Sequence, residues 1–360
     1  MNRSSAALTS IQAISTGAVR PATASTAPAK SQKRSTDTNS GPWPHFSHPK
    51  STFSCQNVGM QNRAPGWLVS AMVISLFGGV IVTRAVTEPK NDFRFSIMGD
   101  RTGGAQPQIW GRVWREIDLL HPDFVINVGD TIQGGRDQFA ELEWAELRPI
   151  FQRYSHYPLY FTPGNHDVFS DTSRAVYEKE TRRPTFYSFD YQDAHFTVLD
   201  NSRTTDLSAD QIAFLERDLE ANKDRNPKFI FFHKPYWIGL LKVGSTDFPL
   251  HKVAKKYGVQ HIISGHGHQF VRIIRDGIAY MEVGSSGGTM VRALEQGHGF
   301  KEGRFYHHVW GRVKGSKVEF TVKEIDGAKG AGRMFKATDW DENGPKFDVG
   351  DPAINDDPQT

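Results

Sequence analysis

The stretch "FSIMGDRTGG", from Phe95 to Gly104, joins an apolar run to a carboxylate and two glycines. The apolar run predicts a buried strand, and the glycines allow the backbone to turn sharply after it. A carboxylate at the end of a buried strand points to a specific role for that side chain. Asp100 is therefore a candidate functional residue.

The same arrangement recurs four more times along the chain. Asp130 follows "FVINVG", "GNHD" (164–167) follows "LYFTP", His233 follows "KFIFF", and "GHGH" (265–268) follows "HIIS". One such stretch alone is weak, because a Gly-Asp pair is often a turn and a single His is often a packed one. In an open α/β sheet, however, sites form at the carboxyl ends of the strands, so the ordered set of five predicts one shared crevice.

The side chains gathered at these strand ends are carboxylates, imidazoles and one amide. Such oxygen and nitrogen ligands suit Mn, Fe, Zn or similar ions. The two His residues of "GHGH" are spaced by two on an extended segment, so they point the same way. Cys55 is the only cysteine, which excludes a disulfide within the chain and a cysteine-based zinc site. The sequence predicts a metal site held by His, Asp and Asn.

From Asn91 onward, apolar strand-like runs alternate with amphipathic helix-like runs. Strands are expected at 93–100, 123–130, 157–167, 228–235 and 258–268, hairpins at 185–200, 270–288 and 305–325, and helices at 107–120, 136–154 and 208–222. The pattern predicts an α/β fold in which a sheet is covered by helices on both faces.

The N-terminal quarter of the chain has a different composition. Residues 1–63 are rich in Ser, Thr, Ala and Pro, and we expect a disordered leader there. Residues 64–86 contain sixteen uncharged residues from Trp67 to Val82, which suit the core of a signal peptide, or an uncleaved membrane anchor. Met60 is an alternative translation start. Either segment predicts export, with the C-terminal domain in the periplasm or outside the cell.

The formal charge of +3 is unevenly distributed. Residues 1–89 contain eight basic and two acidic residues, a balance of +6, and the rest of the chain carries −3. The folded part is therefore not expected to bind nucleic acid, and a membrane is expected to be contacted only through the N-terminal segment. Residues 90–325 are expected to form the functional domain, and 326–360, rich in Gly and Asp, a loose tail.

The ordered set "GD…GD…GNHD…H…GHGH", from about Phe93 to Glu324, resembles the calcineurin-like metallophosphoesterase superfamily. The resemblance implies a two-sheet α/β sandwich flanked by helices, with a dinuclear metal site on loops at one edge. It implies two divalent or trivalent ions (Mn, Fe or Zn) and a phosphate-ester substrate.

The resemblance also implies roles for individual residues. Asp130 would bridge both metals, Asp100 and His268 would complete the first site, and Asn165, His233 and His266 would complete the second. His166 would act as an acid or phosphate contact beside the substrate, oriented by Asp167.

The opening stretch departs from the family pattern. The family usually places a His two positions after the first Asp, where this chain has Thr102, and some members instead use a Tyr at the position of Gln133. Thr102 and Gln133 are candidate weak ligands, or Thr102 only hydrogen-bonds the loop. The first site should therefore bind metal more weakly than the second. Arg101 would clamp a phosphate oxygen, or else pair with an acid such as Asp137.

These features predict an exported enzyme that hydrolyses a phosphomonoester or phosphodiester by attack of a metal-bridging hydroxide. The alternative is a degenerate family member that acts as a binding module at the cell envelope without turnover. A phosphodiesterase for nucleotides or lipids is a third interpretation, and the sequence does not distinguish it from a monoesterase.

Overall fold

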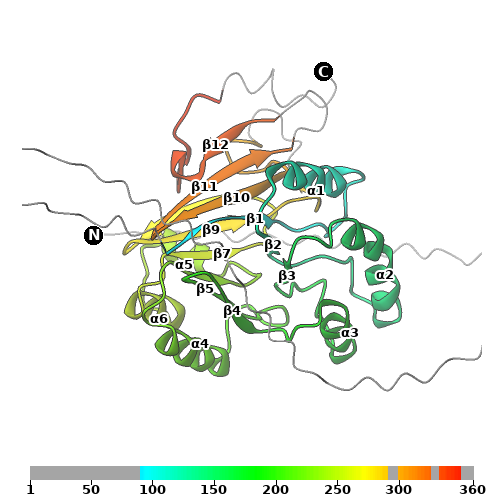
Figure 1. Ribbon diagram of the computed structural model, residues 1–360, viewed down its shortest axis with the longest axis horizontal. Coiled ribbons are helices and arrows are strands. Elements are labelled where there is room, and N and C mark those ends of the chain that lie inside the picture. Colours follow the sequence, from blue (N-terminus) through cyan, green and yellow to red (C-terminus); the bar gives the residue numbers. More distant parts are fainter. Residues whose placement is uncertain (1–89, 291–298, 326–331, 350–360) are drawn as a thin grey trace, which may run out of the picture. The chain divides into compact units, whose positions relative to one another are not determined.

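The structure is a computed structural model that describes residues 90–290, 299–325 and 332–349 (Figure 1). The leader predicted at 1–63 and the signal peptide or anchor predicted at 64–86 lie outside the described residues. Within the described part of the chain, no helix is both long and apolar enough to cross a membrane.

The first of two six-stranded sheets has the strand order β12-β11-β10-β1-β2-β3. Its strands are β1 (Asp92–Met98), β2 (Phe124–Asn127), β3 (Leu159–Tyr160), β10 (His307–Lys314), β11 (Lys317–Glu324) and β12 (Met334–Lys336). Strands β1, β2 and β3 run parallel, while β10 pairs antiparallel with β1. The carboxyl ends of β1, β2 and β3 therefore lie at one edge, as the motif positions require.

The second sheet has the order β4-β5-β6-β7-β9-β8. Its strands are β4 (Tyr187–Tyr191), β5 (Ala194–Val198), β6 (Lys228–Phe231), β7 (His261–Ser264), β8 (Phe270–Arg275) and β9 (Ile278–Val283). Strands β5, β6, β7 and β9 run parallel, and the two outer strands are antiparallel to their neighbours.

Helices cover the outer face of each sheet. They are α1 (Ile109–Leu120), α2 (Asp137–Arg153), α3 (Asp171–Thr181), α4 (Ala209–Ala221), α5 (Trp237–Lys242) and α6 (Pro249–Lys256). On the first sheet, Trp114 of α1 packs in one cluster with Met98 and Val125. On the second, α4, α5 and α6 bury their apolar faces, and α4 and α6 lie side by side (Figure 1). Helices α3, α5 and α6 were not predicted from the sequence.

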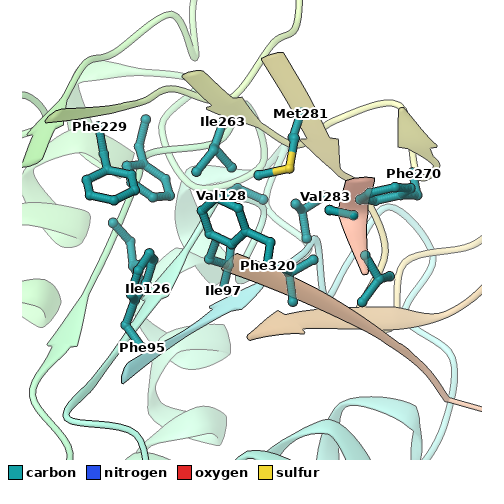
Figure 2. Close-up of a cluster of buried hydrophobic side chains, with 14 of the residues drawn as sticks. Phe95, Ile97, Ile126, Val128, Phe229, Ile263, Phe270, Met281, Val283 and Phe320 are labelled. Atoms are coloured by element: carbon teal, nitrogen blue, oxygen red, sulfur yellow. The ribbon is translucent and has the colours of Figure 1, made fainter. Parts of the chain in front are cut away.

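Aromatic and aliphatic side chains together fill the space between the two sheets (Figure 2). The ring of Phe95 stacks on Phe124 at 5.2 Å and meets Phe229 of the other sheet edge-on at 5.5 Å. Side chains alternate along a strand, so β1 turns Phe95 and Ile97 toward this core and Met98 toward α1.

The predicted two-sheet α/β sandwich flanked by helices is therefore confirmed. The expectation of one sheet with helices on both faces was wrong, because each sheet has helices on its outer face and the other sheet on its inner face. A strand buried on both faces has the same apolar sequence in either case.

The expectation of a loose C-terminal tail is corrected for residues 332–349. Strand β12 extends the first sheet by pairing with β11, and β13 (Trp340–Asp341) pairs with β14 (Gly344–Pro345). Phe335 and Trp340 are buried in the core between the sheets, at 7% and 2% exposure. Two large aromatic side chains thus anchor a segment whose Gly and Asp content suggested no packing.

The two sheets are joined where β1 ends. Asp100 forms a parallel bridge with Ser285, which follows β9. The backbone N–H of Asp100 donates to Gly284 at 3.2 Å, and its carbonyl accepts from Ser286 at 3.0 Å. This junction holds the loops after the parallel strands of both sheets against one another.

Candidate metal centre

Five of the six residues predicted as metal ligands form two overlapping clusters at this edge. Site 1 comprises Asp100, Asp130 and His268, and site 2 comprises Asp130, His233 and His266. Within each group, one potential ligand atom from every residue lies within 4.8 Å of the others. The sixth residue, Asn165, approaches site 2 with its side-chain oxygen 3.1 Å from Nε2 of His233. Asp130 belongs to both groups.

Asp130 is held in place by unusually close backbone packing. It has a φ of 54°, in the left-handed region that non-glycine residues seldom adopt. Its Oδ1 accepts a hydrogen bond from the backbone of His166 at 2.9 Å, and its Oδ2 lies 3.2 Å from Nε2 of His233. A Cβ on Gly164 would lie 2.2 Å from Oδ1, so only glycine allows the "GNHD" loop to come this close.

The orientation of His233 leaves one ring nitrogen for site 2. Its Nδ1 lies 2.8 Å from the carbonyl oxygen of Val128, so Nδ1–H donates there and Nε2 faces the site. Nδ1 of His266 lies 3.2 Å from that Nε2. Metal-ligating imidazoles are commonly oriented by such a hydrogen bond from the other ring nitrogen. Site 2 thus presents nitrogen and oxygen donors to one point.

Site 1 is built around a fully buried carboxylate. Oδ2 of Asp100 accepts a hydrogen bond from the backbone of His266 at 2.7 Å and lies 3.4 Å from Nε2 of His268. Nδ1 of His268 lies 2.6 Å from the carbonyl oxygen of Thr289, which fixes the ring with Nε2 toward Asp100. Among the described residues, Oδ1 of Asp100 has no hydrogen-bond partner.

The electrostatics of the centre couple the carboxylates to the imidazoles. Burial, the largest single effect, favours the neutral form of Asp130, but the charges and hydrogen bonds of His233 and His166 together outweigh it and lower the pKa of Asp130 to about 2. Burial likewise opposes protonation of His233 and His268, yet the neighbouring carboxylates raise each imidazole pKa to about 9. Burial, followed by the charge on His233, lowers the pKa of His266 to about 4. The buried carboxylates thus attract positive charge.

These residues fit a metal centre. A buried carboxylate oxygen without a partner is costly, and Oδ1 of Asp100 is such an atom. A cation would satisfy it. The imidazole, carboxylate and amide donors match the preferences of Mn, Fe and Zn.

Thr102 and Gln133, the two candidate weak ligands, contact each other. The Thr102 hydroxyl donates to Oε1 of Gln133 at 2.5 Å, and the same oxygen accepts the backbone N–H of Gly104 at 3.1 Å. Both side chains therefore have hydrogen-bond partners, and their contact joins the loop after β1 to the loop after β2. This geometry matches the interpretation in which Thr102 hydrogen-bonds the loop.

The expected orientation of His166 by Asp167 was wrong. Asp167 is buried and accepts backbone hydrogen bonds from Thr131, Ile132 and Gly164 at 2.8, 3.1 and 3.0 Å. Nδ1 of His166 instead contacts the carbonyl oxygen of Gln133. These three backbone N–H groups donate to the two carboxylate oxygens of Asp167 at the same time, so Asp167 holds the loops together. Burial, followed by the charge on Asp130, raises its pKa to about 7.

Arg101 is half-buried beside the centre rather than free at its rim. Its Nη1 donates to the carbonyl oxygen of Thr131 at 3.0 Å, and its guanidinium carbon lies 5.5 Å from the centre of the Trp110 ring. Burial lowers the pKa of Arg101. The alternative partner Asp137 instead accepts a hydrogen bond from Ser170 at 2.5 Å. Contact of Arg101 with phosphate stays a prediction.

Two supporting groups were not found from the sequence. The side chain of Asn201 is fully buried and bonds both backbone groups of Lys234, at 2.9 and 2.8 Å, next to His233. The carbonyl oxygen of Thr289 orients His268. Asn201 lies 33 residues from its partner, and a carbonyl group is present in every residue, so neither leaves a local sequence signal.

Comparison with known proteins identifies the domain that carries this centre. Residues 94–270 match the family model described as calcineurin-like phosphoesterase. These residues form a calcineurin-like phosphoesterase domain. The match confirms the resemblance seen in the motifs, and it supports phosphoester hydrolysis and dependence on metal in general terms. A search of curated protein sequences found no match.

Solved structures of phosphatases resemble the domain. A purple acid phosphatase from yellow lupin (Lupinus luteus) seeds is 16% identical, with a TM-score of 0.49, over 69% of this chain and 54% of that protein. The chain thus spans about half the length of the lupin enzyme. A dimetal phosphatase from Danio rerio is 12% identical, with a TM-score of 0.46, over 69% and 99% of the two chains.

A third similar structure is GAP50, the anchor in the inner membrane complex of Plasmodium. It is 14% identical to this chain, with a TM-score of 0.48, over 74% of this chain and 92% of that protein.

Proposed function

We propose that the calcineurin-like phosphoesterase domain is a dinuclear, metal-dependent hydrolase of a phosphomonoester or phosphodiester. The observation that carries the proposal is the shared position of Asp130 in both three-residue groups. One carboxylate common to two cation sites is the arrangement of two-metal phosphoesterases. When bound, the cations supply Lewis acidity, which lowers the pKa of water and neutralises charge on the phosphoryl oxygens.

Other residues of the chain set the charge that faces the substrate and supply a proton to the leaving oxygen. Asn165 contributes a neutral oxygen at site 2, which limits the negative charge that faces an anionic substrate. His166 keeps Nδ1 at the carbonyl oxygen of Gln133, so Nε2 is the nitrogen available to a leaving oxygen. A protonated His166 would pass its Nε2 proton to that oxygen as the ester bond breaks.

The test uses the purified full-length protein. Bound metal is measured, and 4-nitrophenyl phosphate and bis(4-nitrophenyl) phosphate are assayed with added Mn. We expect turnover of at least one ester and its loss in Asp130→Ala. The matched control, Asp210→Asn, removes an exposed carboxylate in the first turn of α4 and should retain turnover. Equal activity in Asp130→Ala and the unmodified protein, or no turnover of either ester, would overturn the proposal.

The second candidate is a binding module without turnover. One observation favours it, namely that the Thr102 hydroxyl is already hydrogen-bonded to Gln133 at the position where the family usually has a histidine ligand. Metal binding at site 2, combined with no hydrolysis of either ester, would support this candidate.

We also propose that the protein is exported and that residues 64–86 act as a signal peptide or anchor. The support is compositional: twenty uncharged residues lie between Arg63 and Arg84. Mapping of the N-terminus in cell fractions tests the proposal. A mature protein in the periplasm or medium that begins after residue 82 indicates cleavage, whereas the intact segment in the membrane fraction indicates an anchor. Intact protein in the cytoplasm would refute export.

A further inference from the structure

Two adjoining grooves lead away from site 1 across the surface. The first, of about 270 Å³, is lined by two predicted ligands, His266 and His268, and by Gln269, Thr289, Met290 and Arg304. The second, of about 350 Å³, shares Gln269 and Arg304 with the first. We call the second the distal groove. A molecule bound at site 1 can therefore extend past Arg304 into it.

The distal groove is built by segments that are distant in the sequence. Its loop at 301–304 is tied to the start of β8, directly after the "GHGH" motif, by a hydrogen bond from Phe270 to the carbonyl oxygen of Gly303 at 2.7 Å. Its far wall comes from residues 340–344, which Arg272 of β8 holds by donating to the carbonyl oxygen of Trp340 at 3.0 Å. The C-terminal segment is thus fixed relative to the metal centre.

The acidic side chains of the distal groove are already neutralised by partners. Glu342 pairs with Arg275 at 2.6 Å, and Asp341 pairs with Lys346 at 3.7 Å. Glu302 lies 3.5 Å from the guanidinium of Arg304.

Two basic side chains of the same groove have no such partner. Lys242, at the end of α5, and Lys301 are exposed, and neither forms an ion pair with any carboxylate in the described part of the chain. The lining carries as many acidic as basic side chains, but Arg275 and Lys346, from outside the groove, pair with two of its carboxylates. Among the described residues, Lys242 and Lys301 are therefore left as two unpaired positive charges close to the site that is predicted to receive a phosphoester. An anionic group that enters it would meet both ammonium groups.

We propose that the distal groove binds a second anionic group of the substrate, a phosphate or a carboxylate, while the ester lies at the metal centre. This inference rests on the proposed function and deepens it, because it names the substrate class: phosphoesters whose alcohol part carries another anion. Arg304 lies where the two grooves meet, and its planar guanidinium suits either anion. Lys242 and Lys301 make a ligand with the second anion bind more tightly than a ligand without it.

The test measures binding, so that it does not depend on turnover. Hexylphosphonate and hexane-1,6-diyl bisphosphonate are titrated calorimetrically into Mn-loaded full-length protein, and 6-phosphonohexanoate replaces the second phosphonate with a carboxylate. We expect the two probes that carry two anionic groups, the two-anion probes, to bind more tightly than hexylphosphonate. Each of Lys242→Gln and Lys301→Gln should reduce that preference about fivefold, the contribution of one charge contact in water, and the double variant should reduce it further. The preference should also fall as salt rises.

The matched control is Lys314→Gln. Lys314 is also exposed and pairs in register with Asp92 at the start of β1, at the end of the strand opposite to Asp100. This variant should leave the preference unchanged. Equal affinity for hexylphosphonate and both two-anion probes would overturn the inference, as would a preference that survives in the double lysine variant. A preference that is lost in that variant supports the groove, even if the separate ester assay shows no turnover and overturns the proposed function alone.

Discussion

Gly265 offers a direct test of whether Asp100 is a metal ligand. A Cβ at this position would lie 2.3 Å from Oδ1 of Asp100 and 2.7 Å from Cγ2 of Val128, whereas ordinary contacts begin at 3.4 Å. The carboxylate must therefore retreat by about 1 Å in Gly265→Ala, well beyond the roughly 0.2 Å tolerance of ligand distances. The φ of Gly265 is outside the left-handed region, so the effect comes from contact and not from backbone strain.

We expect Gly265→Ala to lower Mn affinity at site 1 by about 10- to 100-fold and any turnover by about 100-fold. Overpacking should also cost about 1–3 kcal/mol of folding free energy. Calorimetric titration of metal-free protein measures the affinities, and urea unfolding measures stability separately.

The control is Gly239→Ala, where no atom lies within 4 Å of the added Cβ and the residue is inside α5. That change should stabilise the protein by about 0.5–1 kcal/mol and leave metal binding unchanged. A folded Gly265→Ala variant whose site 1 affinity equals that of the unmodified protein would refute the assignment of Asp100 as a ligand.

Three further predictions concern the metal, the pH and the C-terminal segment. Mn titration should find two unequal sites with site 1 weaker, and equal affinities would contradict the role given to Thr102. Burial acts to lower the pKa of His195, but hydrogen bonds to Asp218 and Asp190 raise it above 6.5. This stabilisation is therefore complete below an unfolded-state pKa of about 6.5 and is lost as pH rises through the higher folded-state value. Urea unfolding across that range should show the loss, and Asp218→Asn should flatten it. Trp340→Ala should cost about 3–5 kcal/mol in the same assay, while Met334→Ala, at 71% exposure, should change stability by less than about 0.5 kcal/mol. Equal effects would show that the segment does not share the core.

The positions of the metal-centre residues could be predicted because each depends on local sequence. An apolar run that ends in Gly-Asp or in "GHGH" specifies both a buried strand and the polar residues that follow it. Since parallel strands bring their carboxyl ends to one edge, that information is enough to group Asp100, Asp130, His233, His266 and His268 at one site.

The partners of several residues could not be predicted, because they lie far away in the sequence. Thr102 bonds Gln133 across 31 residues, and Asp167 reaches Thr131 across 36. Neither spacing has a periodicity that would mark it. The role expected for Asp167 was therefore wrong, because its partners are distant in the sequence. The phosphate contact expected for Arg101 stays a prediction.

The sequence alone determined the strands up to β11, the order of the motifs and the chemical character of the centre, because apolar periodicity and ligand type are properties of short segments. Tertiary structure decided that two sheets pack face to face, that Phe335 and Trp340 close their core, and that the C-terminal segment forms a wall of the distal groove. The physical reason is that the burial of an apolar strand or helix face depends on which other element packs against it. An apolar face packs equally well against a helix or a second sheet, and only the folded chain selects between them.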